Sequence, residues 1–429
     1  MIKRTFLIVL ISLWGAGAAL ANHALEIPQT YGARLNGTAA AGMAHADGGV
    51  AMSVNPAGLA SIQKFMFEGT VTGMILTLRA PVNGPSQEKQ LTSYSTLGLF
   101  GSGVRLHERI VIGFLLYTPS GGGQKYKNVH FGLFPLGPKN DFYGHMVFIE
   151  FGPAIAVNLP GNIRIGFVYR FNYIENWARL NAPDNALNPQ YVFRLDSHMK
   201  GYGFSGYRAG IQWDALEWLH IGVAYRSFVK METVGKQKQR IVGSATGLGT
   251  GLSLGKKTIK ENVRYADSAS GGITFEPVAK TLYLNLDYSY DLYGTRYKSV
   301  IVKVAGMSQT MPYRAKDTHN IRFGIEWYVT PNLPLRAGMG WQNGYGNPRY
   351  HNHTSTGAPG RSFIWSIGTG YRFAEKWHLD IALAYMHNIG NVTDTESFDS
   401  FVKYGKPVAV AGGYSASGYY ASMGLRYFL

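Results

Sequence analysis

The chain has 429 residues, no cysteine and a formal net charge of +16 at pH 7. The lack of cysteine excludes a disulfide framework and a thiolate metal site, and nothing in the composition requires a cofactor. Charged residues make up only 15% of the chain, below the roughly 25% of soluble domains, whereas the 54 Gly and 28 Tyr are unusually many.

The first segment has the pattern of a secretory signal peptide. Two basic residues precede an uncharged apolar run over residues 6–20, which ends in the small-residue pattern Ala19-Leu20-Ala21. The run is shorter than the ~20 residues that a membrane-spanning helix needs. We therefore expect residues 1–21 to be removed, with cleavage before Asn22.

The positive charge has to be interpreted for an exported chain. The basic residues are scattered among Gly and Tyr instead of being clustered, so nucleic acid is not an expected partner. Anionic headgroups and sugar phosphates of outer-membrane lipids, including lipopolysaccharide, fit the charge better.

Residues 22–63 show no regular alternation of hydropathy. They contain a small-residue stretch at 37–44 and then Asn55, Pro56, Ala57 and Gly58, an order that suits a type I turn.

From Lys64 to the end, the sequence alternates between apolar and polar residues with a period of two, which indicates strands with one apolar face. The clearest examples are residues 163–171, 321–329 and 379–385. After the signal no apolar run reaches about 18 residues, so a helical membrane protein is excluded. Alternation alone fits both a soluble sandwich and a membrane barrel.

The connections favour the barrel. Short turns are expected near 106–108, 159–161, 214–217, 277–280, 331–333 and 374–376, and long connections over 81–92, 120–143, 181–199, 231–266, 299–318, 344–360 and 388–411. Short and long alternate strictly, as in an up-and-down barrel with tight periplasmic turns and long external loops. The prediction is an all-β fold: a transmembrane antiparallel β-barrel of 14 strands over residues 64–429, with both termini on the periplasmic side of the cell outer membrane.

Two further features support this orientation. Aromatic residues gather at the short turns, as in an interfacial girdle: Trp213, Trp218, Trp327, Tyr371, Phe373 and Trp377. The closing strand over 421–429 resembles the terminal strand that barrels present to the barrel-assembly machinery, although it ends in Leu429 where Phe is usual.

A barrel of this width needs something inside it. About eight strands already enclose as much space as side chains can fill. Residues 22–63 are therefore expected to form an N-terminal hatch that plugs the lumen.

Here the sequence resembles the FadL/TodX family of outer-membrane transporters of long-chain fatty acids and aromatic hydrocarbons. The resemblance rests on segment 44–59 with its Asn-Pro-Ala-Gly-Leu, on 335–340, on 368–373 and on the closing strand. It implies transport of hydrophobic small molecules by loop capture, lumenal binding and hatch-gated release, with exit in that family thought to run sideways beside a kinked strand. Asn55, Pro56 and Ala57, completed by Gly58, are carried over as the hatch turn.

Candidate ligand contacts come from the face opposite the apolar one. It carries Arg164, Arg170, Arg208, Arg226, Arg322, Arg336, Arg372 and Arg426 against Glu150, Asp287, Asp291, Glu326 and Asp380. Arg170 and Arg226 are the predicted partners of a substrate carboxylate. For each arginine the more frequent alternative is an internal ion pair that braces the wall.

Two external loops stand out. Phe131, Leu133, Phe134 and Leu136 make the first unusually apolar, which marks a binding surface and predicts a loop that captures substrate. The second, over 236–260, has basic ends; contact with lipopolysaccharide and simple solvation fit it equally.

Enzyme and metal functions are not expected. Gly251-Leu252-Ser253-Leu254-Gly255 has the spacing of a hydrolase nucleophile elbow, but it lies in a Gly-rich loop and lacks the required strand-turn-helix context. His351 and His353 lack a third ligand and are interpreted as surface residues. The alternatives that stay open are a related barrel used as a protein-secretion or assembly component, and a general diffusion porin, which the plug disfavours.

Overall fold

The computed structural model describes residues 31–129, 140–183, 190–244, 246, 248–351, 357–374, 376–404 and 409–429. The expected signal peptide at 1–21 therefore lies outside the described residues. No helix among the described residues is long and apolar enough to cross a membrane.

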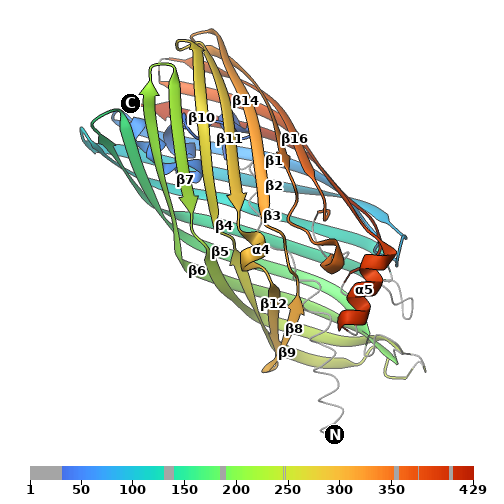
Figure 1. Ribbon diagram of the computed structural model, residues 1–429. Coiled ribbons are helices and arrows are strands. Elements are labelled where there is room, and N and C mark those ends of the chain that lie inside the picture. Colours follow the sequence, from blue (N-terminus) through green and yellow to red (C-terminus); the bar gives the residue numbers. More distant parts are fainter. Residues whose placement is uncertain are drawn as a thin grey trace.

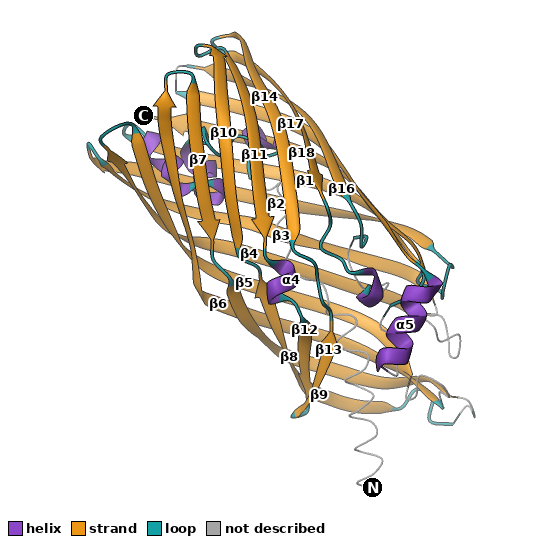
Figure 2. Ribbon diagram, viewed as in Figure 1, coloured by secondary structure: helices purple, strands orange, loops and turns teal. Residues whose placement is uncertain are grey.

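The molecule is a β-barrel with short helices inside it and at one end (Figures 1 and 2). The strands are β1 (Phe65–Ala80), β2 (Lys89–His107), β3 (Ile110–Val129), β4 (Asn140–Leu159), β5 (Ile163–Pro183), β6 (Tyr191–Leu216), β7 (Leu219–Arg226), β8 (Val229–Ser244), β9 (Ser253–Tyr265), β10 (Ser268–Val278), β11 (Leu282–Asp291), β12 (Ser299–Val304), β13 (Met307–Pro312), β14 (Thr318–Thr330), β15 (Leu333–Gln342), β16 (Ser362–Phe373), β17 (Trp377–Val392) and β18 (Gly412–Phe428). The helices are α2 (Ala33–Asn36), α3 (Gly48–Val54), η2 (Pro56–Ser61), α4 (Tyr293–Arg296), η3 (Pro348–Tyr350) and α5 (Asp394–Tyr404).

All neighbouring strands pair antiparallel, and β1 pairs with both β2 and β18, so the sheet closes on itself. Closure leaves no unpaired edge in the hydrocarbon. Four of the barrel strands are interrupted, and each consists of two segments: β7 and β8, β9 and β10, β11 and β12, and β13 and β14. The 18 segments thus form 14 strands, which confirms the predicted architecture.

The interruptions all lie at one level of the wall. Arg226 pairs with Ser268, Ser268 pairs with Asp291, and Asp291 pairs with Thr318, so the four strand ends form a single line across the sheet. We call this line the seam. Below it the wall consists of β7, β10, β11 and β14; above it β8, β9, β12 and β13 form an upper wall.

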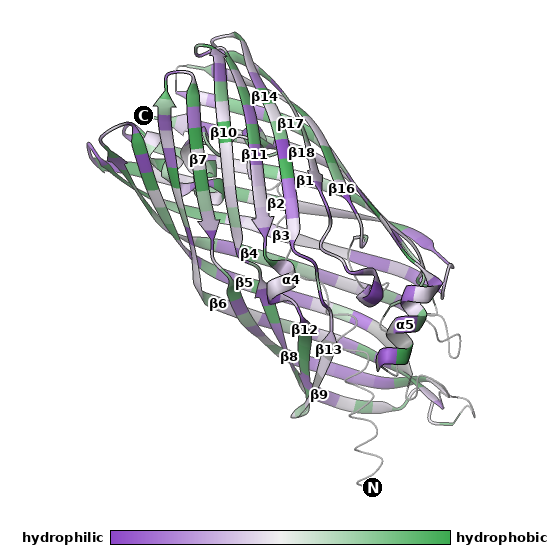
Figure 3. Ribbon diagram, viewed as in Figure 1, coloured by the Kyte–Doolittle hydropathy of each residue, from purple (hydrophilic) through white to green (hydrophobic). Residues whose placement is uncertain are grey.

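The residues that face away from the lumen in the lower wall are apolar, and Figure 3 shows the resulting bands of hydropathy along the strands. Trp213, Trp218, Trp327 and Tyr371 are 43–54% exposed near the short turns, which is where an interfacial girdle belongs. The six short turns lie where they were predicted.

The long connections are shorter than predicted. Residues 231–244 and 253–265 belong to β8 and β9, and 299–304 and 307–312 form the hairpin of β12 and β13. The predicted loop over 231–266 was therefore wrong. The reason is that the outward face of the upper wall is charged, while its inner face mixes polar residues with buried apolar ones such as Ile259 and Val302. Strands there lack the apolar outward face by which the sequence reveals the lipid-facing ones.

Candidate functional site

The N-terminal segment, residues 31–63, lies inside the barrel at the end that carries the short turns and the C-terminus (Figure 1). Helices α2 and α3 and the short helix η2 contact the inner faces of strands from both halves of the sheet, including β2, β5 and β17. Asn55 caps the start of η2: its Oδ1 accepts a hydrogen bond from the Ala57 backbone amide, and the Gly58 backbone amide donates to the Asn55 carbonyl. This i to i+3 bond is the one that a type I turn makes.

Glycines of the wall make room for the segment. A Cβ atom at Gly166 would lie 2.2 Å from the Pro56 carbonyl carbon, and one at Gly210 would lie 2.1 Å from Asn55 Oδ1. The side-chain Nδ2 of Asn55 donates to the Ile211 carbonyl at 2.9 Å, which fixes the turn against β6. The bare backbone of β5 and β6 therefore forms a slot for the Asn55-Pro56 turn.

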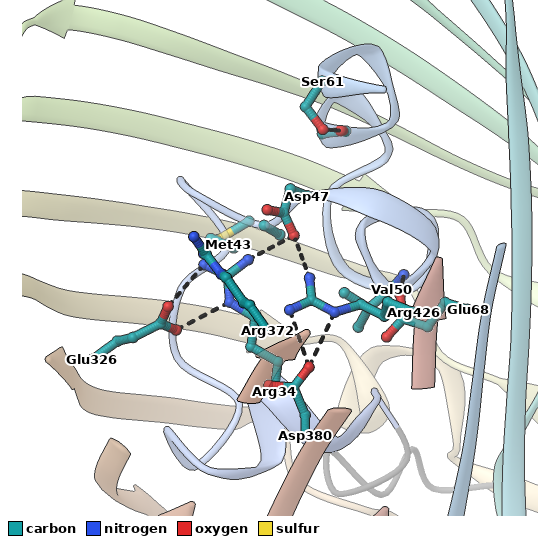
Figure 4. Close-up of polar contacts among 12 residues, drawn as sticks. Arg34, Met43, Asp47, Val50, Ser61, Glu68, Glu326, Arg372, Asp380 and Arg426 are labelled. Carbon is teal, nitrogen blue, oxygen red and sulfur yellow. Dashed lines mark hydrogen bonds and ion pairs between the residues drawn. The ribbon is translucent and has the colours of Figure 1, made fainter. Parts of the chain in front are cut away.

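Six charged side chains form a closed ring that joins the segment to the wall, and Figure 4 labels five of them, all but Arg336. In order they are Arg34, Glu326, Arg336, Asp380, Arg426 and Asp47, and successive members lie 3.0, 3.0, 2.8, 3.0, 3.1 and, back to Arg34, 2.6 Å apart. Arg34 and Asp47 belong to the N-terminal segment; the other four come from β14, β15, β17 and β18. Because the charges alternate in sign, every arginine has two acidic neighbours and the ring is neutral.

Beyond the segment, on the side away from the short turns, the lumen holds a cavity of about 250 Å³. A single buried water needs only ~10–15 Å³, so the cavity is large enough for a small organic ligand. Tyr31, Met43 and Val54 of the segment form its floor, and Tyr293 and Tyr345 line its far end. These two tyrosine rings pack 6.0 Å apart within a larger buried apolar cluster.

The cavity has two chemically different sides. One side is apolar, with Met74, Leu76, Met146, Ile364, Met386 and Tyr420. The other follows the seam and is polar, with Arg226, Ser268, Asp291, Asn320 and Arg322. An amphipathic molecule therefore matches the lining better than a uniformly polar one does.

The arginines of the inner face differ in how they are paired. Arg170 is fully buried, lies 2.5 Å from Glu150 and is not among the residues that line the cavity. Arg226 lines the cavity and is 3.7 Å from Asp291 and stacked on Tyr265. Of the two residues selected from the sequence, Arg170 thus has the bracing geometry and Arg226 faces the cavity.

Arg322 has a position that the sequence did not single out. It lines the cavity, and among the described residues no carboxylate lies within ion-pair distance of it. Asp287 stands directly opposite across β11 and β14, but its Oδ2 accepts hydrogen bonds from the Gly42 and Met43 amides of the segment. The Arg322 guanidinium is left facing the cavity.

The wall has an opening between β2 and β3. The β2–β3 ladder covers only the part of β2 from Leu99 onward, whereas β2 pairs with β1 from Lys89 to Val104. At this height β3 carries a bulge between Tyr117 and Ser120, followed by Gly121, Gly122 and Gly123. Three successive glycines within a strand are the signal that the sequence offered for this irregularity.

The opening lies next to the lumenal cavity. A second cavity reaches the outer surface at Tyr94, which is 76% exposed. Both cavities are lined by Met74, Ser120, Gly121, Gly122 and Tyr420. These residues therefore form the wall that separates the apolar side of the lumen from the lipid-facing surface.

Other sequence candidates have different outcomes. The apolar capture loop with Phe131, Leu133, Phe134 and Leu136 lies outside the described residues, as does His353. The interpretation of His351 as a surface residue is wrong: it is 1% exposed, its Nε2 donates to the Gly357 carbonyl, and burial lowers its pKa to about 4. Ser253 begins the exposed strand end of β9 in a β-hairpin.

A closed 14-strand barrel, filled at its periplasmic end and holding an amphipathic cavity beyond, defines an outer-membrane channel for small molecules. The chain belongs to the outer membrane protein transport family (OMPP1/FadL/TodX), whose family model matches residues 13–428. This is a family of transporters of hydrophobic compounds and not of enzymes. The resemblance seen in the sequence is thereby confirmed.

Solved structures share the fold. A FadL homologue of Pseudomonas aeruginosa has a TM-score of 0.73 and 16% identity, covering 94% of this chain and 99% of that one. The toluene transporter TodX of P. putida has a TM-score of 0.73 and 14% identity over 94% and 99%. The monoaromatic hydrocarbon channel CymD has a TM-score of 0.70 and 16% identity over 94% and 98%. A search of curated protein sequences found no match.

Proposed function

We propose that this protein takes long-chain carboxylic acids into the lumenal cavity of its barrel and releases them sideways into the outer membrane through the β2–β3 opening. The observation that carries the proposal is the two-sided cavity, which is polar along the seam, where Arg322 faces it, and adjoins the β2–β3 opening on its apolar side. The N-terminal segment is the hatch that keeps this path closed to the periplasm. A lumen filled in this way disfavours the open porin, and the family favours transport over a secretion role.

The apolar side suits a hydrocarbon chain. Met74, Met146 and Met386 supply unbranched, adaptable side chains that accommodate ligands of varied shape. Met74 also lines the cavity at the opening, so a chain packed against it lies next to the proposed exit. Loop residues 131–136 remain the proposed site of capture.

The polar side suits the head of the same molecule. Arg322 presents a guanidinium to the cavity, and Arg226 lines it at the seam, three strands away. A carboxylate placed at Arg322 gains charge-assisted hydrogen bonds, whereas a neutral hydrocarbon does not. Arg170, which is paired with Glu150, provides an internal comparison because it has the same charge but no access to the cavity.

The test compares ligands that differ only in the head. Arg322→Met should weaken binding of a C16 carboxylic acid to the purified barrel by about tenfold or more, since a hydrogen bond to a charged group contributes ~1.5–3 kcal/mol. Binding of the C16 alcohol should change little. Arg170→Met, tested for folding first, should not discriminate between the two. Equal losses of acid and alcohol in folded Arg322→Met would remove the carboxylate role and favour neutral hydrocarbons as substrates.

The exit can be tested separately. Gly121→Phe should fill the opening, because a Cβ at this position lies 3.3 Å from Leu97 Cδ2 and points along the shared lining. Uptake by cells should fall severalfold while binding to the purified protein is retained. Gly69→Phe is the matched control, since nothing lies within 4 Å of a Cβ there. Unchanged uptake by Gly121→Phe would exclude the lateral exit.

A further inference from the structure

The outward face of the upper wall brings cations directly opposite one another. The antiparallel register pairs Lys238 with Lys256, Lys260 with Lys303, Lys230 with Arg264 and, on the β6 side, Arg194 with Arg240. Directly opposed side chains on one face of an antiparallel sheet have Cβ atoms about 4.5–5.5 Å apart, and like charges in this position are destabilising. Lys260 and Arg194 each have a carboxylate within ion-pair distance, Glu232 and Asp196, so the uncompensated repulsion falls on the pairs Lys238 with Lys256 and Lys230 with Arg264.

Acidic residues do not balance this face. The cations on the outward face of β8, β9 and β12 are Lys230, Lys236, Lys238, Arg240, Lys256, Lys260, Arg264 and Lys303. The one carboxylate on the same face of these three strands is Glu232, which is paired with Lys260 at 3.0 Å. Glu261 belongs to the buried inner face, at 2% exposure.

The neighbouring strands compensate their own charges. On β6, Asp196 pairs with Arg194 and with Arg179 of β5. Glu175 of β5 binds both His198 and Lys200. Compared with β5 and β6, the excess of positive charge therefore lies on β8, β9 and β12, whose outward side we call the basic face.

The basic face begins just above the lipid-facing band. On β7 the outward residues up to Tyr225 are uncharged and mostly apolar, as are those of β10 from Ala269 to Phe275. Lys230 follows Tyr225 by five residues, or roughly 16 Å along the strand at ~3.3 Å per residue. Because the short turns are periplasmic, this height corresponds to the headgroup layer of the outer leaflet and the space beyond it.

We propose that the basic face binds the phosphorylated sugars of lipopolysaccharide. The outer leaflet presents phosphates fixed to a sugar backbone at this height, and each pair of opposed cations can hold one phosphate between them by charge-assisted hydrogen bonds. Binding of this kind removes the repulsion that the register otherwise imposes. This role concerns anchoring of the upper wall and is independent of the transported ligand.

The experiment uses the full mature protein and deep-rough lipopolysaccharide. The variant Lys238→Gln/Lys256→Gln/Lys303→Gln removes one cation from each of β8, β9 and β12 and changes side-chain length little. The control Lys89→Gln/Lys125→Gln/Lys127→Gln removes three cations from β2 and β3 instead. Folding of both is verified by heat-modifiable migration.

Wild type should bind lipopolysaccharide at least tenfold more tightly than the basic-face variant, with an affinity that falls as salt rises, and the control should match wild type. Wild type should bind dephosphorylated lipopolysaccharide as weakly as the basic-face variant binds the phosphorylated form. Equal affinities of wild type and variant, an equal loss in the control, or undiminished binding of the dephosphorylated form would overturn the proposal. Competition by millimolar inorganic phosphate alone would assign the face to free phosphate and would equally overturn it.

Discussion

Neutralising Asp47 tests whether the ring of charges holds the N-terminal segment in the lumen. Asp47 Oδ1 lies 2.6 Å from Arg34 Nη1 and 3.1 Å from Arg426 Nη1, so Asp47→Asn leaves two arginines facing each other without the carboxylate between them. Removing one partner of a buried ion pair costs about 3–5 kcal/mol. Because the Asp47 side chain is 34% exposed, the lower end of that range applies.

A cost of about 3 kcal/mol shifts an equilibrium about a hundredfold. The equilibrium here lies between the docked segment and a locally released one. In planar bilayers, wild type should show rare openings, and Asp47→Asn should raise the open probability by up to two orders of magnitude. The barrel itself should stay folded, since its closure rests on the strand ladders.

Two further variants make the result specific. Arg34→Met/Asp47→Asn removes both links of the ring between the segment and the wall, Arg34 to Glu326 and Asp47 to Arg426, and should open at least as often as Asp47→Asn alone; together with Arg34→Met it completes a double-mutant cycle. Asp141→Asn breaks a surface pair with Lys125 at 3.6 Å and should change nothing, since such pairs contribute ~0–1 kcal/mol. An unchanged open probability in folded Asp47→Asn, or an equal rise in Asp141→Asn, would refute the reasoning.

Three other outcomes are expected. Gly210→Leu should displace the Asn55-Pro56 turn, because its Cβ alone would overlap Asn55 Oδ1, and should make the segment sensitive to limited proteolysis. Gly271→Leu, whose Cβ has no contact closer than 3.9 Å, should not have this effect. Equal cleavage of the two variants would contradict the slot. Deleting residues 22–60 should turn a nearly non-conducting barrel into an open channel, whereas porin-like conductance of the intact protein would contradict the plug. The mature chain should lack residues 1–21, fractionate with the outer membrane and migrate heat-modifiably, and recovery from the periplasm without detergent would contradict all three.

The lower wall could be predicted because lipid imposes a strict pattern. The residues between 321 and 329 alternate so regularly since one face meets hydrocarbon and the other the lumen, and they lie within β14. The upper wall could not be predicted in this way. In β8, Lys236 and Lys238 point outward, and the buried inner face holds Gln237 beside Met231. The outward face is thus the charged one, so the alternation has the opposite sense to that of a lipid-facing strand.

The site was less accessible to sequence reasoning because it depends on register. Arg170 and Arg322 are both inward-facing arginines on alternating strands, and only the placement of Glu150 beside one of them separates a bracing residue from one that faces the cavity. Register at Glu150 depends on bulges in β3 and β5 that shift the pairing. The ring likewise joins Arg34 to Glu326, which are 292 positions apart in the chain.

The seam divides the barrel into two parts that can be altered separately. The slot for the Asn55-Pro56 turn and the ring of charges both lie below it, while the basic face and the tyrosines around α4 lie above it. Since β8 with β9 and β12 with β13 each form a hairpin of their own, either can be exchanged between relatives by cutting the chain at its two ends on the seam. Such chimaeras would allow binding at the external surface to be studied separately from closure of the lumen at the periplasmic end.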